Sequence, residues 1–425
     1  MGMMFSHVYY TKPQLLLMTS TPFFGVTFFI FGGNIMILSI GLILMLGFLI
    51  GWLLSKIKIP GLVGMIIIGI VIGPYCLSLI DDSILNISKE LRQIALVIIL
   101  TRSGLNLDIE SLKKIGRPAI LMSFIPATLE IIGVALISIL LLKLNIFESL
   151  LLGSVLAAVS PAVVSPRMIK LIENRLGENH QVPKLILAGS SVDDIYVIVL
   201  FYLFLGLVEN NVFNITSVLT IPLTITLGIL LGILVGIILA TILNKTNFKL
   251  AINVLIVLST SFLMIGLENI LKEYISISSL LAIMVMGIVL LFKEPTKSKE
   301  LSVGYNNLWL FFEIILFVLV GATVDFSYAL NNSLKAILIL LFGLTFRMLG
   351  VLLCLIKTNL NNKEKLFSII SYLPKATVQA SIGGIALSMG LSCGTIVLTV
   401  SVIAILITAP LGALLIDKLS QKLLE

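Results

Sequence analysis

Two adjacent aspartates, Asp193 and Asp194, lie near the middle of the apolar stretch 184–208. Two neighbouring carboxylates in apolar surroundings cannot both stay ionised comfortably unless a proton or a cation joins them. Carboxylate oxygens suit a proton or a small hard cation. Competition between a proton and a cation for one carboxylate would couple the movements of the two. The alternative is a structural pair bonded to nearby backbone or hydroxyl groups.

Three further charged residues, Glu130, Arg347 and Lys375, also lie within long apolar stretches. A charged side chain at the centre of a membrane helix costs about 2.5–3.5 kcal/mol on the insertion scale, so such residues mark a site where partners exist. Glu130 and Arg347 have opposite charges and similar expected depths. We therefore expect an ion pair between their helices, and its role is open between a structural bridge and a functional one.

Prolines interrupt two of the apolar stretches. Pro161 and Pro166 fall in 148–166, and Pro374 comes just before Lys375 in 366–389. Proline removes a backbone donor, and broken helices at membrane depth are tolerated where they line a cavity. The freed carbonyls and amides can then face an ion. We expect both segments to be broken helices.

The composition of the chain is strongly apolar, and charged residues are rare in it. Of the 425 residues, 59% are apolar and 12% are charged, and the mean hydropathy is +1.17. A soluble domain is about 45–50% apolar and about 25% charged, so this chain is predicted to be an all-α polytopic membrane protein. The net charge of +7 does not indicate nucleic-acid binding, because the basic residues are spread over short loops.

Neither a cofactor nor an enzyme is expected. Cys76, Cys354 and Cys393 lie inside apolar runs without metal-ligand spacing. The sequence contains no nucleophile–base pair, metal-ligand set or phosphate-binding loop. Any transport must therefore draw its energy from an ion gradient.

Hydropathy predicts about fourteen spanning helices. Their predicted ranges are 14–32, 35–55, 61–80, 91–107, 118–142, 148–166, 184–208, 217–243, 250–268, 276–292, 303–325, 334–356, 366–389 and 393–416. Most Lys and Arg residues fall in alternate loops, which predicts that both termini are cytoplasmic. The stretches 118–208 and 334–416 each run charged helix, broken helix, third helix, and they enter the membrane from opposite sides. This is an inverted-topology repeat, in which a site forms where the two broken helices cross.

Three sequence motifs, together with Val192-Asp193-Asp194, support the interpretation as an inverted repeat with a site at its centre. They are Thr-Arg-Ser-Gly-Leu-Asn-Leu-Asp at 101–108, Ala-Ala-Val-Ser-Pro-Ala-Val-Val at 157–164 and Leu-Pro-Lys-Ala-Thr-Val-Gln-Ala at 373–380. In these motifs, and in Glu130 and Arg347, the chain resembles the monovalent cation/proton antiporter superfamily, in its paired-aspartate branch. Within it, the chain is most similar to the sodium/hydrogen exchanger-like subgroup of solute carrier family 9, subfamily B, over essentially its whole length.

The resemblance implies an exchange of Na⁺ or Li⁺ for H⁺ by elevator-type alternating access in a homodimer. It implies that the cation binds at Asp194 with help from Asp193, and that Ser160 and Thr377 supply oxygen ligands or support. It also implies a core domain of about 88–208 and 334–417, and a dimer or scaffold domain of about 14–80 and 217–325.

One departure from the family pattern concerns coupling. Electrogenic members of the branch are expected to carry a lysine where this chain has Arg347, and an arginine does not release its proton at any accessible pH. We therefore expect Arg347 to pair with Glu130 or Asp193 rather than to carry the proton, which favours an electroneutral exchange.

Other interpretations of the same fold are K⁺/H⁺ exchange, a cation-flux protein of the spore-germination type and a cation channel. The Ile-, Asn- and Lys-rich composition is typical of an AT-rich bacterial genome. We therefore predict an integral protein of a bacterial cell membrane. Its expected partners are the lipid bilayer, a monovalent cation, a proton and a second copy, and no nucleic acid.

Overall fold

The computed structural model describes residues 35–107, 114–209, 215–246, 248–271 and 277–424, and every regular element in these ranges is a helix. The first predicted span, 14–32, lies outside them, as does Asp108 of the first motif. The helices are α1 (Ile35–Lys56), α2 (Gly61–Ile72), α3 (Asp82–Asn86), α4 (Ser88–Leu105), α6 (Arg117–Met122), α7 (Ile125–Leu142), α8 (Ile146–Ala157), α9 (Pro161–Glu173), α10 (Val182–Glu209), α11 (Ile215–Lys245), α12 (Leu250–Leu271), α13 (Ser279–Lys293), α14 (Pro295–Ala322), α15 (Phe326–Cys354), α16 (Asn362–Ser371), α17 (Thr377–Gly383), α18 (Ile385–Ser388) and α19 (Gly394–Leu424).

The described helices have the lengths and composition of a membrane protein. Nine spans in the described ranges are long and apolar enough to cross a bilayer, and α2 and α13 are shorter apolar helices. The predicted all-α membrane class is confirmed, whereas the number of crossings stays a prediction. Differences from the predicted ranges follow from prolines and caps: α2 ends at Ile72 because Gly73-Pro74 follows, and the predicted span 118–142 is divided into α6 and α7 just before Pro126.

Both predicted broken helices are present, but one proline does not act as expected. The first break covers residues 158–160, between α8 and α9, and the second covers 372–376, between α16 and α17. Pro161 is the first residue of α9, a position where proline needs no backbone donor. Pro166 lies inside α9, which continues to Glu173, so the expectation that it interrupts the helix was wrong. Its missing N–H removes one helical bond without ending the helix.

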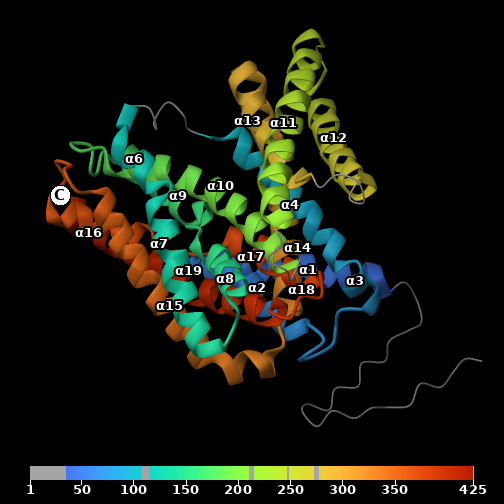
Figure 1. Ribbon diagram of the computed structural model, residues 1–425, viewed down its shortest axis with the longest axis horizontal. Helices are drawn as coiled ribbons and strands as arrows, with labels where there is room; N and C mark the ends of the chain where they lie inside the picture. Colours follow the sequence, from blue (N-terminus) through green and yellow to red (C-terminus); the bar gives the residue numbers. More distant parts are fainter. Residues whose placement is uncertain (1–34, 108–113, 210–214, 247, 272–276, 425) are drawn as a thin grey trace, which may run out of the picture. The chain divides into compact units, whose positions relative to one another are not determined.

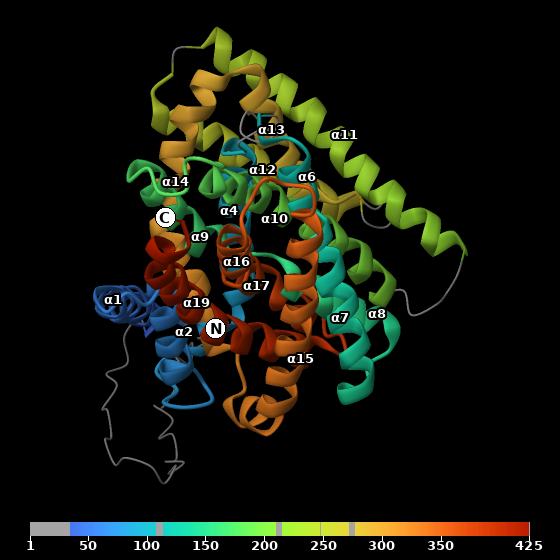
Figure 2. The ribbon, with the colours of Figure 1, turned by 90° about the vertical axis from the view of Figure 1, so that its left-hand side faces the viewer.

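The helices of residues 36–424 pack as two groups (Figures 1 and 2). One group contains α6–α10 and α15–α19, with α15 along α7 and α8 between α7 and α10. The other contains α2, α4 and α11–α14, with α11 along α13 and with α14 against both α2 and α4. Figure 1 shows α11, α12 and α13 together and away from α15 and α16. Helix α4 lies against α13 and α14. The resemblance implied that α4 belongs to the core domain, whereas α13 and α14 fall in the range of the scaffold domain.

Glycines allow these helices to approach closely. Gly104 of α4 and Gly287 of α13 face each other, and a Cβ atom built on Gly104 would lie 3.1 Å from the Gly287 Cα and would meet the Met284 carbonyl oxygen. Small residues at such crossings are the usual means of packing helices in a membrane, where apolar burial alone does not favour association.

We expect Gly104→Ala to destabilise the protein by about 1–3 kcal/mol, because the added methyl group meets backbone that cannot move aside. A lowered midpoint of thermal unfolding in detergent would show this. Gly266→Ala in α12 is the matched control, because nothing lies within 4 Å of a Cβ atom at Gly266. Equal midpoints for the two variants would contradict the close crossing.

Candidate ion-binding site

The two breaks meet and are bonded to each other directly. The backbone N–H of Ser160 in the first break donates to the carbonyl of Pro374 in the second, at 2.8 Å. Each break leaves other backbone N–H and C=O groups without helical partners. Those that this bond does not satisfy need side chains or ligands as hydrogen-bond partners. The crossing is therefore the place where polar groups collect.

Side chains satisfy the carbonyls at the end of α8. Gln379 of α17 donates through its Nε2 atom to the carbonyls of Ala158, at 2.8 Å, and Leu156, at 3.3 Å. Arg347 Nη1 donates to the carbonyl of Ala157 between them. The other end of the Gln379 amide, Oε1, accepts the backbone N–H of Ala376, at 2.8 Å. The negative end of the α8 dipole thus faces a cation and an amide.

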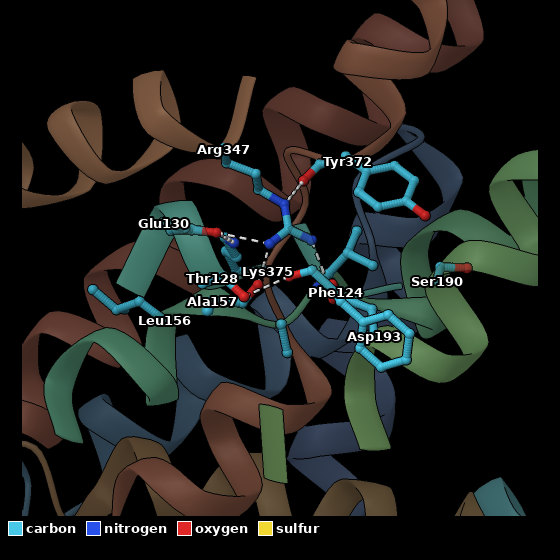
Figure 3. Close-up of polar contacts among 12 residues, drawn as sticks. Phe124, Thr128, Glu130, Leu156, Ala157, Ser190, Asp193, Arg347, Tyr372 and Lys375 are labelled. Atoms are coloured by element: carbon cyan, nitrogen blue, oxygen red, sulfur yellow. Dashed lines mark hydrogen bonds and ion pairs between the residues drawn. The ribbon is translucent and has the colours of Figure 1, made fainter. Parts of the chain in front are cut away.

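Arg347 of α15 is completely buried at the centre of this arrangement (Figure 3). Its Nε donates to the carbonyl of Tyr372, at 2.7 Å, in the second break. Nη1 donates to Glu130 Oε2, at 2.8 Å, and Nη2 to Asp193 Oδ2, at 3.1 Å. The sequence left open whether Arg347 pairs with Glu130 or with Asp193, and the structure places it against both.

Lys375 is a second buried cation, which the sequence identified as a charge within an apolar stretch and as part of a broken helix, but without naming its partner. Its Nζ donates to Glu130 Oε2, at 2.6 Å, and its backbone N–H donates to Thr408 Oγ1, at 2.9 Å. Glu130 thus carries two cationic partners on one oxygen, whereas Glu130 Oε1 has no hydrogen-bond partner. The depth argument that linked Glu130 to Arg347 applies equally to Lys375 and would have found this pair.

The paired aspartates lie next to each other on α10 in different surroundings. Asp193 is completely buried, and its Oδ2 accepts the backbone N–H of Val159, at 2.8 Å, as well as Arg347. Asp194 is 7% exposed and makes no ion pair with Arg347 or Lys375 among the described contacts. The Oδ1 atoms of both aspartates are buried without a hydrogen-bond partner.

The two predicted hydroxyl ligands lie at the starts of the second half-helices. Ser160 directly precedes α9, next to the Val159 N–H that Asp193 binds, and its Oγ is buried without a partner. Thr377 is buried as the first residue of α17, directly after the second break. Both residues are thus at the crossing, on the half-helices whose amino ends carry partial positive charge.

We expect Arg347→Met to lower the free energy of unfolding by about 3–5 kcal/mol, because it leaves Glu130 and Asp193 buried with less compensating charge. Thermal unfolding in detergent measures this loss. The double variant Arg347→Met/Glu130→Gln should recover part of it.

Arg167→Met is the control, because Arg167 pairs with Asp417 where both side chains are partly exposed and such pairs contribute at most about 1 kcal/mol. Losses of similar size at positions 347 and 167 would show that the buried arginine is not needed to balance charge.

Comparison with known proteins identifies the family and the fold of the chain. Residues 41–420 match the family described as "Sodium/hydrogen exchanger, transmembrane". The chain is 36% identical to mouse sodium/hydrogen exchanger 9B1, over 93% of this chain and 72% of that protein. It is 33% identical to human sodium/hydrogen exchanger 9B2, over 88% of this chain and 73% of that protein.

The fold is similar to that of the sodium proton antiporter MjNhaP1 from Methanocaldococcus jannaschii. The TM-score is 0.78 and the identity is 25%, over 91% of this chain and 98% of the other. This likeness confirms the predicted antiporter fold. With the family match over nearly the whole chain, it shows that the protein is an integral membrane protein and that the chain belongs to the sodium/hydrogen exchanger family.

Proposed function

We propose that this protein exchanges Na⁺ or Li⁺ for H⁺ across a membrane, and that Asp193 and Asp194 are the site for which the cation and the proton compete. The observation that supports this best is a set of buried oxygens without partners at the helix crossing: Oδ1 of both aspartates and Oγ of Ser160. A buried acceptor without a partner costs about 1–3 kcal/mol, so these oxygens favour a ligand that satisfies them. Carboxylate and hydroxyl oxygens are ligands of small hard cations, and a carboxylate also takes a proton.

The two aspartates have different tasks in this proposal. Asp193 is held by the Val159 N–H and by Arg347, so one of its oxygens is already committed. Asp194 is the more exposed of the two and contacts neither buried cation as an ion pair. We assign Asp194 as the residue that exchanges its proton for the cation, and Asp193 as a fixed negative ligand beside it.

Charge balance supports a one-for-one exchange. The buried cluster contains three carboxylates, Glu130, Asp193 and Asp194, and two cations, Arg347 and Lys375. One negative charge is therefore uncompensated when all five groups are ionised, and either one proton or one Na⁺ neutralises the cluster. A neutral cluster is much cheaper to carry through a low-dielectric membrane than a charged one. This favours an electroneutral cycle in which Arg347 and Lys375 keep their protons.

The two helix groups support an elevator-type movement of a core against a scaffold. We assign α6–α10 and α15–α19 to the core, and α2, α4 and α11–α14 to the scaffold. The core range implied by the resemblance, about 88–208 and 334–417, includes α4, but the packing of α4 along α13 and α14 fits the scaffold better. Homodimer formation through this scaffold and cytoplasmic termini are parts of the same proposal.

We assign a cavity between the groups as the outer part of an access path, although none of the ion-site residues lines it. It has a volume of about 540 Å³, and its lining includes Arg92 of α4, Tyr202 of α10, Glu268 of α12 and Ser381 of α17. The cavity therefore lies where core and scaffold meet. The carboxyl end of α10 and the amino end of α4 line it as well, and the positive-inside pattern predicts that these ends face outside.

We expect Asp194→Asn to reduce Na⁺-driven proton movement in proteoliposomes by at least about 100-fold, because the amide neither takes up the proton nor supplies the negative charge. A pH-sensitive dye inside the vesicles reports the exchange when Na⁺, Li⁺ or K⁺ is added outside. Asp417→Asn makes the same substitution in a partly exposed ion pair with Arg167 and should leave exchange near the wild-type rate.

Retained exchange in Asp194→Asn would reject the site, and exchange driven only by K⁺ would reject the proposed cation. The wild-type rate should not change when a membrane potential is imposed, since one charge replaces another. A rate that follows the potential would overturn the electroneutral cycle.

A further inference from the structure

Gln379 is a buried polar residue that the ion-site argument does not use. It is completely buried in the first turn of α17, and its amide contacts both broken helices. Its carbonyl oxygen accepts the Ala376 N–H, while its Nε2 donates to the carbonyls of Ala158 and Leu156. Both ends of the side chain are therefore committed at the crossing of the breaks.

We infer that Gln379 determines cation selectivity by keeping the carbonyls of Leu156 and Ala158 away from the transported ion. This deepens the proposed function and rests on it. Carbonyls at the end of a broken membrane helix are the groups that coordinate cations in other transporters. Here the amide of Gln379 occupies two of them, and Arg347 occupies the Ala157 carbonyl between them.

What remains for the ion is a small set of hard oxygens. The partnerless oxygens of α10 and the first break are the carboxylate Oδ1 atoms of Asp193 and Asp194 and the hydroxyl of Ser160, and Glu130 Oε1 and the Tyr372 hydroxyl are partnerless as well. A few ligands of high charge favour a small, strongly hydrated cation such as Na⁺ or Li⁺. Additional neutral carbonyl dipoles favour K⁺, whose shell in selective filters is made of such groups. Gln379 thus limits the shell to the ligands that suit the smaller ions.

The two ends of Gln379 can be tested separately. Gln379→Met has a similar length and removes the donor and the acceptor together. Gln379→Glu keeps an oxygen that can accept the Ala376 N–H but lacks the NH₂ group that serves both carbonyls. Thr399→Val is the control, because Thr399 is a buried residue of α19 whose hydroxyl donates only within its own helix, to Thr395.

Selectivity is measured in two ways on the purified protein. One is the midpoint of thermal unfolding as a function of Na⁺, Li⁺ or K⁺ concentration, which reports cation binding without transport. The other is the half-saturating concentration of each cation in proteoliposome exchange. We expect Gln379→Met to lower the preference for Na⁺ over K⁺ by about tenfold or more, and Thr399→Val to leave it unchanged. Gln379→Glu should lower the preference less, because its carboxylate adds a charged oxygen that favours Na⁺.

An unchanged Na⁺/K⁺ preference in both glutamine variants, with a lowered unfolding midpoint, would overturn the inference and leave Gln379 as a structural link only. If Gln379→Met does not fold, Gln379→Leu takes its place, because leucine also removes both polar ends without adding a charge. A wild-type protein that shows neither cation-dependent stabilisation nor exchange rejects the proposed function itself, and this inference with it. A selective wild type with equally selective variants rejects the inference alone.

Discussion

The ionic site depends on one buried guanidinium group. Arg347 bonds the carbonyls at the carboxyl ends of two interrupted helices, Ala157 and Tyr372, and it also bonds Glu130 and Asp193. A permanently charged, planar group with five donors can make all these contacts at once, which a lysine ammonium cannot do in the same geometry. Its positive charge stabilises the negative ends of both helix dipoles and the two carboxylates. Water does not solvate these groups in the buried crossing.

These contacts leave some polar groups of the crossing hydrogen-bonded and others without a protein partner. Gln379 and the Ser160–Pro374 backbone bond take up further groups of the two breaks. Oxygens of Asp193, Asp194 and Ser160 stay without partners, and the cluster keeps one negative charge more than it has positive. The same packing that stabilises the broken helices thus leaves a gap in charge and in hydrogen bonding that one small cation or one proton fills.

Much of the site could be predicted from the sequence, because any deviation from an apolar helix raises the free energy of a chain in a bilayer. The sequence showed four charged residues within long apolar stretches, namely the aspartate pair, Glu130 and Arg347. It also predicted the helix breaks, from Pro161 and Pro374. Pro166 was misjudged, because one lost hydrogen bond does not end a helix that the neighbouring turns support. Gln379 was part of the third motif but was given no role, since a neutral amide in an apolar stretch gives little signal until its partners are known.

The sequence by itself determined the membrane class, the short set of candidate site residues and the two interrupted helices, because hydropathy, charge and proline act locally along the chain. Only the tertiary structure decided that Arg347 serves Glu130 and Asp193 together and that Lys375 shares Glu130. It also placed α4 against α13 and α14. These outcomes depend on which helix faces lie together, and a residue's depth in the membrane does not specify the direction in which its side chain points.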